Sequence, residues 1–175
     1  KGAPYEPDDP ITPLGVYGKS KAAGEAATRK ANPRHFILRT AWLYGPGGNN
    51  FVEKILGLAA ERDTLQVVED EVGSPTHTLD LAEATLGLVR TKNYGVYHAA
   101  NDGQCSRYAF AKEILHVAEL ERTVRPCSSD TFPAKAPRPQ YSVLDNSKLA
   151  ETLGYTMRPW RQALLEYMQR REVRA

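Results

Sequence analysis

Tyr17 and Lys21 form a pair of side chains whose types and spacing suit proton transfer. Residues four positions apart on a helix lie on the same face, so the phenol and the ammonium group would be neighbours. A free phenol has a pKa of about 10, and a nearby ammonium group favours the phenolate and lowers that pKa. Such a pair can give a proton to a carbonyl oxygen, or take one back in the reverse reaction.

The same spacing occurs a second time, so the motif is not specific by itself. Tyr108 and Lys112 lie within an amphipathic pattern that is typical of a helix packed on a core, and we expect Tyr108 in the core or at its rim. The context of Tyr17 is different. A loop with four prolines (residues 2–14) precedes it, and a helix with a face of small residues follows it.

Alternating helical and strand patterns predict an α/β fold, in which these side chains are held by helices and by the ends of strands. We expect helices at about 15–31, 50–61, 81–90, 106–119, 146–153 and 159–170, and strands at 36–41, 65–68 and 95–100, with a short strand from Val124. Thr78 or Asp80 is predicted to cap the third helix, Ser106 the fourth and Asn146 or Ser147 the fifth. The loop 128–142 has no period.

Four further blocks follow one another along the chain: RTAWLYG (39–45), GNNF (48–51), DEVGSPT (70–76) and APRPQYSVLD (136–145). In this order, and after the Tyr17–Lys21 motif, they resemble the dTDP-4-dehydrorhamnose reductase family of the extended short-chain dehydrogenase/reductases. Together with the Tyr17–Lys21 motif, the blocks are spread over most of the chain, in the order in which the family has them. One departure is Glu71, which stands where the family often has glutamine.

The resemblance implies a fold. We expect the C-terminal half of a Rossmann-like, doubly wound parallel sheet plus a small α/β substrate-binding lobe, made mainly by residues 43–80 and 120–160 of a single partial module (1–175). A glycine-rich turn that would hold a cofactor pyrophosphate is not found, and Gly45-Pro46-Gly47-Gly48 follows a strand too late in the chain to be that turn. The N-terminal cofactor-binding half is therefore expected to be absent, and the chain alone to be inactive.

The resemblance also implies roles for single residues. Tyr17 and Lys21 would be the catalytic residues, and both would contact the cofactor, NADPH or NADH, with Lys21 bound to the nicotinamide ribose. Trp42, at the end of a strand, would pack on the deoxysugar. Arg138, between two prolines, would bind the diphosphate through its planar guanidinium.

Two polar segments complete the expected substrate site. Asn49 and Asn50 precede a helix, so one is expected to cap it and the other to present an amide to the substrate. Ser74, Pro75 and Thr76 would form a rigid turn that holds the nucleotide or sugar, although the turn could also be only a connection.

The implied reaction is hydride transfer from NAD(P)H to the C4 ketone of dTDP-4-dehydro-L-rhamnose, which gives dTDP-L-rhamnose. Two alternatives stay open. One is a related epimerase or dehydratase of nucleotide sugars, and the other is a non-catalytic subunit that binds nucleotide. A homodimer and a Mg²⁺ ion are compatible with the sequence without being readable from it.

Composition narrows the class of protein. A net charge of +2 without a basic cluster gives no reason to expect a nucleic-acid partner, and no apolar run approaches the roughly 20 residues of a membrane span. Cys105 and Cys127 are expected to be free thiols of a cytoplasmic protein. His77 and His98 are expected to be structural, and Asp80 and Glu83 to be ordinary acids at a helix start.

Overall fold

The computed structural model describes residues 2–132, 136 and 138–172. Its helices are α1 (Val16–Ala31), α2 (Phe51–Glu61), α3 (Thr78–Val89), α4 (Arg107–Val117), α5 (Ser147–Leu153) and α6 (Trp160–Glu172), with a 3₁₀ turn at Ser129–Thr131. Its strands are β1 (Phe36–Arg39), β2 (Leu43–Tyr44), β3 (Thr64–Val68), β4 (Val72–Gly73), β5 (Thr76–His77), β6 (Gly95–His98), β7 (Cys105–Ser106) and β8 (Thr123–Cys127). Within this part of the chain, no helix is long and apolar enough to span a bilayer.

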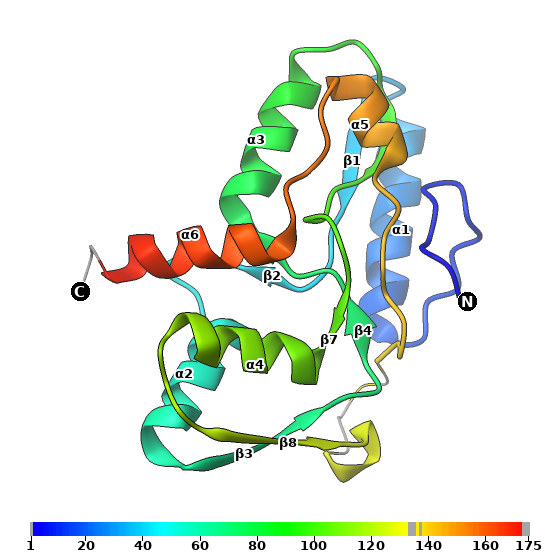
Figure 1. The fold of residues 1–175 in the computed structure, drawn as a ribbon. Coiled ribbons are helices and arrows are strands. Elements are labelled where there is room, and N and C mark those ends of the chain that lie inside the picture. The colour runs from blue at the N-terminus through cyan, green and yellow to red at the C-terminus, as the bar shows by residue number, and fades with distance from the viewer. Residues whose placement is uncertain (1, 133–135, 137, 173–175) are drawn as a thin grey trace.

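The strands form pairs at several levels of the molecule. β1 and β6 run parallel, with Phe36 opposite Gly95, and β3 and β8 run parallel, with Thr64 opposite Thr123. β2 pairs with β5 in parallel, and β4 pairs with β7 antiparallel. In Figure 1, β1 lies among α1, α3 and α5, whereas β3 and β8 run below α2 and α4, and α6 crosses between these two groups. The predicted α/β class is confirmed.

Two hydrophobic clusters correspond to these two groups of elements. The larger includes Phe110, Ile114, Trp160 and Leu164 and joins α2, β3, α4 and α6. The smaller joins α3, β6 and α5 around residues such as Leu88 and Tyr97. Tyr108 is partly buried against the larger cluster, as predicted for a residue at the rim.

Helix starts differ from the expected ones at two places. His77, and neither Thr78 nor Asp80, is the residue before α3, and it makes no side-chain capping bond. Asn146 does not cap α5 with its side chain, because its amide exchanges two hydrogen bonds with the backbone of Ala100 (3.1 and 2.8 Å). Ser106 caps α4 as predicted.

Asp80 is more than an ordinary acid at a helix start, and that prediction was wrong. It is 8% exposed, and its carboxylate accepts hydrogen bonds from Asn101 Nδ2 (2.7 Å) and Arg158 Nε (3.0 Å). Asn101 Oδ1 in turn accepts the backbone N–H of His77 (2.8 Å). This network ties the start of α3 to the chain before α6, so it connects the two groups of elements.

We predict that Asp80→Ala lowers the free energy of unfolding by about 3 kcal/mol, because it leaves Arg158 and Asn101 without their common acceptor. Glu83→Ala, on an exposed position of the same helix, is the matched control and should stay within about 0.5 kcal/mol of the parent. Urea denaturation measures both. Equal effects of the two substitutions would contradict a structural role for Asp80.

Candidate functional site

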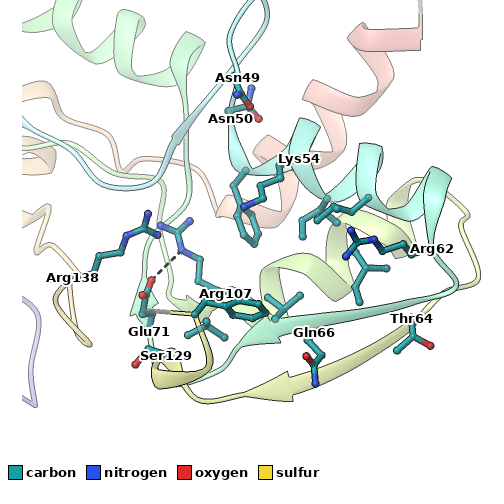
Figure 2. Close-up of a pocket in the computed structure, with 17 residues that line it drawn as sticks. Asn49, Asn50, Lys54, Arg62, Thr64, Gln66, Glu71, Arg107, Ser129 and Arg138 are labelled. Atoms are coloured by element: carbon teal, nitrogen blue, oxygen red, sulfur yellow. Dashed lines mark ion pairs between the residues drawn. The ribbon is translucent and has the colours of Figure 1, made fainter. Parts of the chain in front are cut away.

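A pocket of about 820 Å³ lies between α2, β3 and the start of α4 (Figure 2). Its lining combines apolar side chains with amides and cations: Asn49, Asn50, Phe51, Lys54, Ile55, Leu58, Arg62, Thr64, Leu65, Gln66, Val67, Val68, Glu71, Arg107, Ser129, Phe132 and Arg138. Figure 2 shows Arg107 and Arg138 at one end and Arg62 and Thr64 at the other. The pocket is therefore lined by both apolar and charged side chains.

The charges on the lining favour an anionic ligand. Among the described lining residues, Lys54, Arg62, Arg107 and Arg138 are cationic and Glu71 is the one acid. Glu71 forms an ion pair with Arg107 (Nε–Oε2 3.6 Å), and within the described chain no acid pairs with the other three cations. A group of unneutralised cations around a cavity attracts and holds negative charge.

Arg107 is the most buried of these cations, and sequence reasoning missed it. Its guanidinium carbon lies 3.6 Å from the ring centre of Trp42 and 5.0 Å from that of Phe51. Burial lowers its pKa to about 10, with Glu71 opposing this change and Arg138 adding to it. Glu71, the departure from the family pattern, is thus the carboxylate that faces this arginine. No motif or period singles out Arg107, since it is simply the first residue of α4.

Trp42 is partly buried and does not itself line the pocket, but its indole contacts Arg107, which does. Its backbone φ is +47°, a left-handed conformation that costs a bulky residue on the order of 1–3 kcal/mol. Its carbonyl accepts the N–H of Thr76 (3.2 Å). A Cβ on Gly73 would come within 2.5 Å of the indole, so only glycine allows this approach. The indole is therefore fixed between the backbone of β4 and the Arg107 guanidinium.

Of the two asparagines expected at this helix start, Asn50 caps α2, whereas Asn49 is exposed and lines the pocket. Asn50 Oδ1 accepts the N–H groups of Val52 (3.0 Å) and Glu53 (3.2 Å). Its Nδ2 donates to the carbonyls of Gly45 (2.9 Å) and Gly48 (3.2 Å). The Gly45–Gly48 loop is therefore closed on Asn50, and the first amides of α2 are already occupied.

Ser74, Pro75 and Thr76 are buried and do not line this pocket. Ser74 Oγ donates to the carbonyl of Gly103 (2.7 Å), and Thr76 Oγ1 donates to that of Ser74 (3.2 Å). These bonds describe a fixed connection between β4 and β5, so a ligand contact of this turn stays a prediction.

Tyr17 and Lys21 lie together on α1, with Lys21 Nζ 5.6 Å from the centre of the Tyr17 ring. Tyr17 is 74% exposed, and neither residue lines the pocket. The distance from Lys112 to the Tyr108 ring is the same, 5.6 Å. The two pairs thus differ in exposure and not in their own geometry.

Arg138 is exposed and lies near Arg107. Because of this proximity, its positive charge contributes to the lowered pKa of Arg107. Figure 2 shows both guanidinium groups on the same side of Glu71. Pro137, one of the two prolines expected to hold Arg138, lies outside the described residues.

A second cavity, of about 550 Å³, lies between the loop 46–48 and α6. Its arginines are already neutralised, since Arg170 pairs with Glu166 (2.6 Å) and Arg171 with Glu53 (3.0 Å). In the described part of the chain, no three His, Cys, Asp or Glu side chains gather as a potential metal site. The first pocket is therefore the better candidate for an anionic ligand.

Comparison with known proteins identifies relatives of this chain in sequence and in structure. The chain is 45% identical over 168 residues to the spore coat polysaccharide biosynthesis protein SpsK of Bacillus subtilis, covering 96% of this chain and 59% of that protein. A solved dTDP-4-dehydrorhamnose reductase from Clostridium acetobutylicum superposes with a TM-score of 0.94 at 41% identity, over 98% of this chain and 61% of that one. Another from Bacillus anthracis, in complex with NADP, gives 0.91 at 36%, over 97% and 60%.

This chain thus spans about three fifths of the length of these relatives. The sequence profile of the RmlD substrate binding domain matches residues 1–173, almost from end to end. The chain belongs to the RmlD substrate binding domain family.

Proposed function

We propose that this chain is the substrate-binding part of a reductase that transfers hydride from NADPH or NADH to the C4 ketone of dTDP-4-dehydro-L-rhamnose. The product would be dTDP-L-rhamnose, a precursor for cell-surface polysaccharide. The observation that carries the proposal is the pocket lined by three cations without an acidic partner in the described chain, one of which, Arg138, lies beside the Arg107 that stacks on Trp42. Its membership of the RmlD family supports the same reading.

Each part of a nucleotide sugar has a counterpart in the site. The apolar wall that includes Ile55 and Leu58 suits the nucleobase, because a planar base buries well against aliphatic side chains. Arg138 suits the diphosphate, since a guanidinium binds phosphate oxygens in pairs. The indole of Trp42 suits the apolar face of a deoxyhexose.

The chemistry is assigned to Tyr17 and Lys21. Bound NADPH or NADH would supply the hydride. Tyr17 would give its proton to the C4 oxygen, and Lys21 would stabilise the phenolate that remains. Both side chains are open on one face of α1, so they fit the nicotinamide end of a cofactor. The Gly45–Gly48 loop and the start of α2 do not fit the pyrophosphate end, because that end needs free backbone amides and Asn50 Oδ1 already accepts the first amides of α2.

Compartment and assembly belong to the same proposal. Cys105 and Cys127 are free thiols, which fits a reducing cytoplasm. A homodimer stays a prediction.

We predict that Trp42→Ala in the intact protein lowers turnover of the dTDP-sugar about 10-fold or more while leaving NADPH affinity unchanged. Arg138→Ala should instead raise KM by roughly 10- to 100-fold with little change in kcat, because the diphosphate is the same in ground and transition states. Steady-state kinetics and NADPH titration measure both. Loss of NADPH affinity in either variant would indicate that the residue is structural.

We predict that Tyr17→Phe lowers the rate of the chemical step by roughly 10²- to 10⁴-fold, the usual cost of losing a general acid. Binding of dTDP should be kept. Tyr108→Phe is the matched control, since Lys112 lies at the same distance from its ring, and it should be nearly silent. Single-turnover oxidation of NADPH measures the step. An epimerase or dehydratase would not consume NADPH stoichiometrically. A silent Tyr17→Phe with a damaging Tyr108→Phe would refute the assignment.

A further inference from the structure

Arg107 is a largely buried cation, and Glu71 is its one acidic partner in the described chain. Its side chain is 17% exposed, and its one ion pair, with Glu71, has a separation of 3.6 Å, which is longer than a hydrogen bond. A guanidinium carries five N–H donors, and among the described residues only Glu71 is positioned to accept from those of Arg107, which leaves most of the donors without an acceptor in the described chain. Burying such a group is unfavourable unless an acceptor is supplied.

The geometry indicates where an acceptor for Arg107 would lie. Arg107 lines the pocket, and Figure 2 shows its guanidinium turned toward that of Arg138. Two guanidinium groups repel each other unless an anion lies between them. Burial lowers the pKa of Arg107, and an anion at this place would favour the charged guanidinium and so raise that pKa. The ion pair with Glu71 involves the Nε atom of Arg107.

The same guanidinium also lies on the indole. Its carbon is 3.6 Å from the ring centre of Trp42, while Gly73 packs against the Cε2 and Nε1 atoms of the same ring. Arg107 covers a face of the indole, so a ligand can contact that face only if Arg107 moves. An anion that draws the guanidinium toward Arg138 would therefore change the surroundings of Trp42.

We propose that Arg107 is the buried anchor of the substrate diphosphate, and that binding of the diphosphate draws it from the indole of Trp42 and so frees that ring for the sugar. Arg107 thus contacts the diphosphate directly and positions the sugar through Trp42. The inference rests on the proposed function, because it takes a nucleoside diphosphate as the ligand. It adds a residue that the motif blocks do not contain.

The test uses the intact protein and compares dTDP with thymidine, which lacks the phosphates. Calorimetry should find that Arg107→Met weakens dTDP binding about 10- to 100-fold, as expected for lost hydrogen bonds to a charged group, while thymidine affinity changes less than about 2-fold. Arg107→Lys should restore part of the loss, because it keeps the charge without the planar fork.

Arg161→Met is the matched control. Arg161 also lies over a tryptophan, 4.4 Å from the Trp160 ring centre, but outside the pocket, and its loss should leave dTDP affinity unchanged. Tryptophan fluorescence gives the second readout, with the Trp42 signal taken as the difference between the parent and Trp42→Phe. Addition of dTDP should change this signal in the parent and not in Arg107→Met.

Three outcomes would overturn the inference in distinguishable ways. If Arg107→Met bound dTDP within 2-fold of the parent, Arg107 would not be an anchor, and the proposed function would stand. If it lost thymidine and dTDP affinity equally, Arg107 would have only a structural role. If the parent itself bound NADPH but not dTDP, the proposed function would fail and this inference with it.

Discussion

The stacking of the Arg107 guanidinium on the indole of Trp42 is the contact around which the pocket is organised. It requires a left-handed backbone at Trp42 and a glycine at position 73, and it places a cation where Phe51, Glu71 and Arg138 converge. Each of these features is unfavourable or uninformative in isolation. Together they produce a site in which a positive charge lies over the face of a flat ring, and the proposed sugar diphosphate would offer an anion to the charge and an apolar face to the ring.

The rest of the fold keeps this arrangement in place. α2 starts at the Asn50 cap and supplies Phe51 and Lys54 to the pocket, while α4 starts at the Ser106 cap and supplies Arg107. Both helices pack on the same hydrophobic cluster. Helix caps define where a helix begins, so two short polar side chains determine where the two helices that line the pocket start.

The sequence predicted the elements better than the site. Apolar runs identified β1 and β6, and their parallel pairing follows from the α/β pattern. Local rules failed where tertiary contacts decide. Asn146 could cap α5 but bonds to Ala100, and Asp80 resembles a helix-start acid but accepts hydrogen bonds from Asn101 and Arg158. Arg107 has no local signal at all, because its partners Trp42 and Glu71 lie far from it in the chain.

The central claim is that a nucleoside diphosphate lies in the pocket between Arg107 and Arg138, next to Trp42. A crystal structure of the intact protein with dTDP and NADP⁺ tests it most directly. Our account predicts phosphate oxygens within about 3.2 Å of guanidinium nitrogens of both arginines and the Arg107 guanidinium displaced from the indole. A nucleotide bound elsewhere, such as in the cavity between the loop 46–48 and α6, with Arg107 still stacked on Trp42, would contradict it.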